Sequence, residues 1–265
     1  MKTKTDFLLS KWYLDCVAPN GDTFIGYHAA MKWKALAFNY SASITNLKKQ
    51  GPESRRSLKK IPPPQVDEAA IYWDSPSLNV KGKWTRGAKP FCQTLFESPE
   101  GLVSWECVMP QGEGEIVLDD ANPIRGNGYI EHLTLTIKPW LLPIEELRWG
   151  RFHSPESTVV WIEWREPAPR QFVYLDGVLQ RDSSVTDTLV TVDNGNLSLI
   201  LEDKAVLRKG ALVSTALSSI PGLNEIVPNN LMNAFETKWR SRGVLNNRDC
   251  APGKGWAIHE TIKFR

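Results

Sequence analysis

A twelve-residue motif occurs twice in this chain and constrains its fold more than any other feature. The copies read GNGYIEHLTLTI at 126–137 and GKGWAIHETIKF at 253–264. In register, they share two glycines, an aromatic residue, a histidine and a threonine. The second copy starts 127 residues after the first in a chain of 265 residues. Self-similarity at this spacing predicts two related halves in tandem.

Each copy has the alternation of a β-strand, with one mainly apolar face. In the first copy Tyr129 and Glu131 share that face, and in the second Trp256 and Glu260 share it. A carboxylate on an apolar face is costly unless it is paired or protonated. We therefore expect both glutamates to point into the interior and to be the catalytic candidates, with the two motif histidines on the opposite face.

Composition sets limits on the class of protein. With 42% hydrophobic residues the chain can bury a substantial core, and its net charge of +2 gives no reason to expect nucleic acid as a partner. The four cysteines and four histidines show no metal-ligand spacing, so no metal and no cofactor is expected. No apolar run matches a signal peptide or a membrane helix, which favours a cytoplasmic protein without a membrane span. The oligomeric state stays open.

Short alternating runs separated by Gly, Pro, Asn and Asp predict an all-β fold. Antiparallel strands that must hide their edges tend to close into barrels. We expect two antiparallel barrels packed on each other, one over 1–138 and one over 139–265. The basic, Pro-rich stretch 46–65 is expected to be an exposed loop, either a solvated insertion or a lid or anionic docking segment.

One short helix is expected near the C-terminus. Asn229 or Asn230 can cap it, and Gly243 can end it. Between them an apolar stripe at helical spacing, more typical of core packing than of a ligand site, consists of Leu231, Met232, Phe235 and Trp239.

The motif and its surroundings resemble a known superfamily. The residues that carry the resemblance are the run 126–132, the crossover Trp140-Leu141-Leu142-Pro143, the strand 147–151, the opening 11–15 and the closing 255–260. They resemble the lipocalin-like carotenoid hydratase (hydroxyneurosporene synthase) superfamily, which includes the fungal decalin-forming Diels–Alderases. The resemblance implies two lipocalin-like barrels in tandem, with a ligand cavity near their interface.

Glu131 is the leading catalytic candidate. On an apolar face it would stay protonated, and a neutral acid in a dry cavity can protonate an alkene or hydrogen-bond to a substrate carbonyl. The alternative is structural: an ion pair with Arg148 or Arg151, or a hydrogen bond from a Trp indole. The same two interpretations apply to Glu260.

The aromatic residues supply the candidate substrate-binding groups, because a flat aromatic wall suits a polyene or a ring system. The candidates are Tyr129, Trp33, Trp84, Trp105, Trp161 and Trp256. His132 and His259 hold equivalent positions, which favours a structural hydrogen bond common to both halves. If the assignment of faces is inverted, these histidines become the inner residues and binding becomes the better interpretation.

Three functions stay open at this stage. The leading hypothesis is a cofactor-free enzyme that cyclises, isomerises or hydrates a hydrophobic polyketide- or terpenoid-like substrate in a barrel cavity. The second is a non-catalytic carrier of a hydrophobic ligand, which gains nothing from buried carboxylates. The third is a self-filled barrel that acts as an interaction module.

Overall fold

The alternating sequence pattern folds almost entirely into antiparallel strands. The computed structural model describes residues 6–48, 50–119, 121–211, 233–247 and 250–264. It divides the chain into two compact units, Met1–Leu142 and Pro143–Arg265, which we call the first and the second unit. The all-β prediction with two antiparallel sheets is confirmed.

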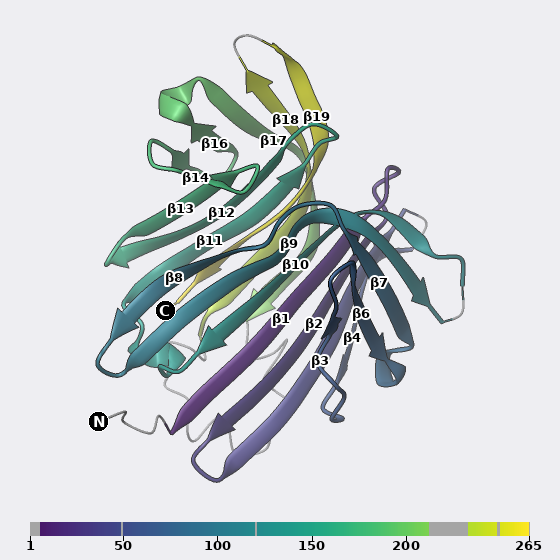
Figure 1. Ribbon diagram of the computed structural model, residues 1–265, viewed down its shortest axis with the longest axis vertical. Helices are drawn as coiled ribbons and strands as arrows, with labels where there is room; N and C mark the ends of the chain where they lie inside the picture. The colour runs from purple at the N-terminus through teal and green to yellow at the C-terminus, as the bar shows by residue number, and fades with distance from the viewer. Residues whose placement is uncertain (1–5, 49, 120, 212–232, 248–249, 265) are drawn as a thin grey trace. The chain divides into compact units, whose positions relative to one another are not determined.

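The first unit holds a 10-stranded sheet. Its strands are β1 (Phe7–Val17), β2 (Thr23–Trp33), β3 (Leu36–Leu47), β4 (Gly51–Ser57), β5 (Gln65–Val66), β6 (Ala70–Ser75), β7 (Val80–Arg86), β8 (Phe91–Ser98), β9 (Gly101–Leu118) and β10 (Ile124–Leu135). Two short 3₁₀ turns, η1 (Pro76–Leu78) and η2 (Pro139–Leu141), complete the unit. The order β4-β3-β2-β1-β10-β9-β7-β6-β5 places β1 between β2 and β10, and β8 pairs with one end of β9 (Figure 1).

Contacts between strands that are distant in this order show that the first sheet is curled. A Cβ added to Gly26 on β2 would lie 2.7 Å from the Trp73 ring on β6, so these strands meet across the interior. At the rim, Arg55 on β4 pairs at 2.6 Å with Asp119, just beyond β9. The concave face is therefore the one that carries Trp73.

That concave face carries the main core of the first unit. Leu14, Cys16, Phe24, Trp84 and Ile130 are all fully buried there. In the first motif copy, Gly128 is needed because a Cβ would lie 2.5 Å from the Trp84 ring. The convex face over β1 and β10 is buried as well, as shown by Tyr13 and Tyr129.

The second unit holds a 9-stranded sheet in the order β14-β13-β12-β11-β19-β18-β17-β16-β15. The strands are β11 (Ile144–His153), β12 (Thr158–Pro167), β13 (Arg170–Leu175), β14 (Val178–Gln180), β15 (Ser184–Val185), β16 (Leu189–Val192), β17 (Leu197–Ala211), β18 (Phe235–Asn247) and β19 (Cys250–Lys263), with the 3₁₀ turn η3 (Asp193–Gly195). As in the first unit, the opening strand pairs with the closing strand that bears the motif. Superposition of the two units remains a prediction.

The second sheet is also curled around an apolar interior. The Arg165 guanidinium on β12 donates to the Val185 carbonyl on β15, and the Gln171 amide on β13 donates to the Ser183 carbonyl next to β15. These contacts join strands from the two ends of the strand order, so the sheet curls back on itself. The enclosed core consists largely of Phe152, Trp161 and aliphatic residues.

Two local expectations were wrong. Residues 46–65 are not all loop, because β4 (Gly51–Ser57) lies within them and pairs with β3. The expected helix starts at residues outside the described part of the chain, and from Phe235 onward the chain is β18. Phe235, Trp239 and Gly243 are spaced four apart, and such residues share a face in a strand as well as in a helix. This spacing therefore did not discriminate between the two.

Candidate functional site

Glu131 lies half-buried on the convex face of the first sheet, where β9 and β10 pair. Its Oε2 accepts a hydrogen bond from the Trp105 indole at 2.7 Å and another from the Tyr129 hydroxyl at 2.8 Å. Two donors on one oxygen stabilise the ionised carboxylate. The sequence suggested an acid that donates a hydrogen bond, whereas in the structure the Glu131 Oε2 atom accepts two.

Aromatic rings surround this carboxylate. The Tyr13 and Tyr129 rings meet edge to face with 6.0 Å between centroids, and Phe91 meets Trp105 in the same way at 5.5 Å. Burial, followed by the nearby Cys107 and Glu131, raises the pKa of Tyr129 well above its ordinary value. Tyr129 is therefore a neutral phenol that keeps its proton directed at Glu131. The indole hydrogen bond considered at the sequence level is present, and it comes from Trp105.

The faces of the motif strands are inverted relative to the sequence prediction. Ile130 belongs to the concave core of the first unit, so Tyr129 and Glu131 point to the convex face. In the second unit Ala257 belongs to the concave core, so Trp256 and Glu260 point away from it. The motif histidines face the interiors instead. Both faces of β10 are buried, as Tyr129 and Ile130 show, so the apolar pattern did not reveal which face was concave.

His132 stacks on the Trp12 indole in the first interior, with 4.3 Å between ring centroids and 16° between planes. Its Nε2 lies 2.8 Å from the Ser10 hydroxyl. Burial lowers the pKa of His132, and this effect exceeds the opposing effect of the Glu106 charge. His132 is therefore a neutral ring held in place by an indole and a hydroxyl.

His259 makes the same pair of contacts with different partners. It stacks on Trp239 at 5.1 Å, and its Nε2 lies 2.8 Å from the Ser241 hydroxyl. Burial first, and then the charges of Lys204 and Lys238, lower the pKa of His259 to about 3. Both motif histidines thus have the structural hydrogen bond that their equivalent positions suggested.

Glu260 lies in a buried ionic cluster on the convex face of the second sheet. It pairs with the Lys238 ammonium, which also lies 3.7 Å from Glu236. The Lys238 ammonium is 5.2 Å from the centroid of the Trp149 ring, and Arg208 pairs with Glu236. Burial raises the pKa of Glu236, and the Glu260 charge adds to this effect. Glu260 is therefore held by an ion pair, which corresponds to the structural interpretation.

The other predicted tryptophans do not gather around Glu131. Trp84 is buried in the first interior, where its indole donates to the Asp15 carbonyl at 2.7 Å, and Trp161 is buried in the second. Trp33 meets Trp140 at 5.2 Å near the end of β2. The guanidinium groups of Arg240 and Arg242 lie 4.9 Å and 4.6 Å from the centroid of the Trp256 ring. Of the predicted set, Tyr129 and Trp105 donate hydrogen bonds to Glu131.

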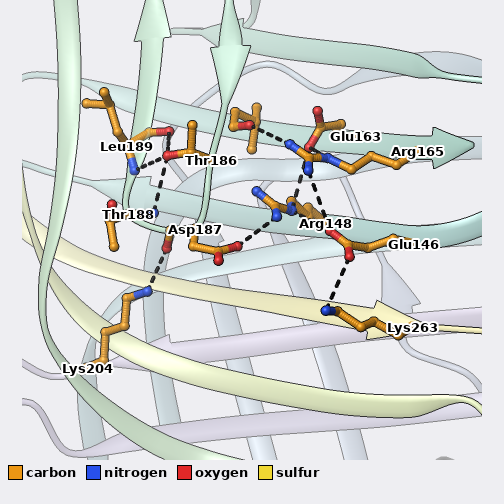
Figure 2. A network of polar contacts seen from close by, with 11 residues as sticks. Glu146, Arg148, Glu163, Arg165, Thr186, Asp187, Thr188, Leu189, Lys204 and Lys263 are labelled. Carbon is orange, nitrogen blue, oxygen red and sulfur yellow. Dashed lines mark hydrogen bonds and ion pairs between the residues drawn. The ribbon is translucent and has the colours of Figure 1, made fainter.

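An ionic network in the second unit was missed by the sequence analysis (Figure 2). Arg148 on β11 lies 2.8 Å from both Glu146 and Asp187, and 3.8 Å from Glu163. Asp187 lies in the β15–β16 turn, so the network joins opposite parts of the curled sheet. Arg148 shares its face with Phe152, so the network closes one end of the apolar interior. Alternating charges at 146, 148, 163 and 165 were the available signal.

Metal and membrane features were searched over the same described residues. No group of His, Cys, Asp and Glu there could hold a metal ion. No helix there is long and apolar enough to cross a membrane.

Comparison with known proteins identifies the fold. No family model and no curated protein matches the sequence. Among solved structures, CghA with bound Sch210972 matches with a TM-score of 0.59 and 9% identity, covering 98% of this chain and 89% of that chain. The chain has a lipocalin-like fold. Kievitone hydratase from Nectria haematococca (TM-score 0.50, 12% identity, 98% and 89% covered) and an ATTH-type protein from Nitrosomonas europaea (0.56, 9%, 99% and 95%) share this lipocalin-like fold.

The resemblance seen in the sequence is thus confirmed for the fold. At identities of 9–12%, the similarity to these structures shows the lipocalin-like fold of this chain but does not identify its site residues. The roles of residues in this chain have to be argued from its own geometry.

Proposed function

We propose that this chain is a cofactor-free enzyme acting on a hydrophobic, polyene-like small molecule of polyketide or terpenoid type. The reaction would be a cyclisation or cycloaddition, an isomerisation, or a hydration. The fold shared with kievitone hydratase and CghA supports an enzyme of this general kind. The observation that carries the proposal is the half-buried Glu131 carboxylate, held by Tyr129 and Trp105 among aromatic rings.

This arrangement supplies a positioned group for proton transfer. As an ionised carboxylate, Glu131 can take a proton from one substrate carbon and return it to another, which is an isomerisation. In a hydration, it can take a proton from the water that attacks one carbon of the double bond and return it to the other carbon. In a cycloaddition no proton moves, and the aromatic surface acts by holding the substrate in a reactive shape. Tyr129 and Trp105 keep the carboxylate oriented in each case.

The test compares Glu131→Gln with the wild-type protein on linear polyenes, with products followed by mass spectrometry in D₂O. For isomerisation or hydration, deuterium enters the product, and we expect Glu131→Gln to lower the rate by roughly 10²–10⁴. For a cycloaddition, no deuterium enters and the loss is small. Glu113→Gln, at an exposed position on the neighbouring strand β9, is the matched control and should behave as wild type.

Stability separates a catalytic from a structural role. The amide oxygen of a glutamine still accepts from Trp105 and Tyr129, so Glu131→Gln should unfold within about 1 kcal/mol of wild type. A much larger loss of stability, with unchanged turnover, would rule against Glu131 as the catalytic group. Binding of polyenes without any turnover by the wild-type protein would favour the carrier.

A further inference from the structure

The interior of the first sheet contains polar atoms that have no partner among the described residues. They are His28 Nδ1, Ser41 Oγ, Trp73 Nε1 and Ser75 Oγ. The exposed fractions of these residues are 3%, 0%, 1% and 0%, so solvent does not satisfy them. Buried polar groups without a partner are costly and rare, and they point to a missing ligand or water.

Register places these groups on one face. His28 on β2 is the direct cross-strand neighbour of Ser41 on β3. His28 shares the concave face of β2 with Phe24 and Gly26, and Trp73 from β6 packs on Gly26 from across the interior. His28 and Ser41 are therefore neighbours on the concave face, and Trp73 reaches this face from the opposite part of the curled sheet.

The state of His28 defines what the site recognises. Its Nε2 lies 3.2 Å from the Ile61 carbonyl, which can only accept, so Nε2 carries the hydrogen and Nδ1 is left with a lone pair. Burial lowers the pKa of His28, which keeps the ring neutral. His28 Nδ1 is thus an acceptor, Trp73 Nε1 is a donor, and the Ser41 hydroxyl is both.

We propose that this interior binds the hydroxyl group of an apolar small molecule, with His28 Nδ1 accepting the hydroxyl hydrogen and Ser41 or Trp73 donating to its oxygen. A hydroxyl is the small group that both donates and accepts at one atom. A carboxylate fits poorly because neither the neutral His28 nor its neighbours Ser41 and Trp73 supply a positive charge. The apolar body would lie against the aromatic surface of Trp12, Phe24 and Trp73.

The segment 58–64 gives a route to this interior. It contains no strand between β4 and β5, and Ile61 packs its side chain against the core while its carbonyl holds His28. This segment can move without breaking a strand pairing. The site lies on the opposite face of the sheet from Glu131, so it stands whether or not Glu131 is catalytic.

The experiment measures binding to the full chain of three matched probes: 2-naphthol, naphthalene and 2-naphthoate. Binding is followed by probe fluorescence. One added hydrogen-bonded pair corresponds to roughly tenfold in affinity, so 2-naphthol should bind about tenfold more tightly than naphthalene. This preference should disappear in His28→Phe and weaken in Ser41→Val. His259→Gln, which alters the interior histidine of the other unit, is the control and should keep the preference.

Several results would overturn the proposal. Equal affinity for naphthol and naphthalene, tighter binding of naphthoate, or no binding of any probe would each do so. So would a naphthol preference that survives in His28→Phe. If that variant fails to fold, nitrogen NMR of the wild-type His28 ring decides: naphthol should shift the Nδ1 signal. An unshifted signal at saturating probe would mean that a buried water alone satisfies these groups.

Discussion

In each unit, four adjacent strands contribute a row of four cross-strand neighbours to the interior. The two rows occupy equivalent places in the strand order, and their side chains differ in polarity. In the first unit, β3, β2, β1 and β10 contribute Ser41, His28, Trp12 and His132. In the second unit, β13, β12, β11 and β19 contribute Val173, Trp161, Gly150 and His259. The motif histidine ends both rows, while the two positions farthest from it are polar in the first unit (His28 and Ser41) and apolar in the second (Trp161 and Val173).

The same strand order therefore encloses two different interiors, one apolar and one with polar side chains. In the second unit the Trp161 indole lies over Gly150, which has no side chain, and fills the space itself. The ionic network around Arg148 then closes one end of this interior (Figure 2). In the first unit His28 and Ser41 occupy the positions of Trp161 and Val173, and His28 Nδ1 and Ser41 Oγ lack partners among the described residues. In the second interior an indole takes the place of the polar pair, whereas the first interior keeps buried polar atoms without a partner among the described residues.

Trp161→His, which moves the residue of the first row into the second, should have the largest effect. It removes a buried indole and adds a polar ring with no partner, so the free energy of unfolding should fall by roughly 3–5 kcal/mol. Urea unfolding measures this. Trp161→Phe keeps an apolar ring and should cost less than half as much. Equal costs for the two variants would show that the second interior tolerates polar groups.

The pH dependence of stability should reveal His259. Its pKa is about 3 in the folded protein and ordinarily 6.5, so the folded state binds fewer protons than the unfolded state between these values. The stability due to the neutral ring is complete above pH 6.5 and is lost as the pH falls toward 3, by about 1 kcal/mol per pH unit. Comparing wild type with His259→Gln between pH 6.5 and 5 limits interference from carboxylates. Parallel slopes for the two proteins would contradict this prediction.

The smallest effect is expected for Ser41→Val, which gives the first row the residue of the second. Removing an unpartnered buried hydroxyl relieves its desolvation, so stability should change by less than about 1 kcal/mol, and upward if at all. The reciprocal Val173→Ser should cost about 2 kcal/mol, since it buries a hydroxyl in an apolar core. Thermal unfolding of both variants checks the pair. Equal losses in both would remove the contrast between the interiors.

The sequence predicted the fold class because alternation along a strand records burial directly. It did not predict the orientation of Glu131, because β10 is buried on both faces and no polar face marks the outside. The prediction of a helix over Phe235 and Trp239 was wrong for a related reason. Residues four apart share a face in a helix and also in a strand. His28 was missed because a single histidine in an apolar strand forms no pattern. Its significance depends on Ser41, which strand pairing brings beside it, and on Trp73, which the curl of the sheet brings to the same face.

The pairing of first and last strands also sets when each unit can fold. Leu9 on β1 is paired with Leu135 on β10, and Glu146 on β11 is paired with Lys263 on β19. Neither sheet can form its central ladder until the distant strand has been made, and such long-range pairings form slowly. During synthesis, the first unit can complete its sheet once residue 135 has emerged, while the second must wait for residue 263. A ribosome stalled between these points should carry a first unit that resists protease and a second unit that does not.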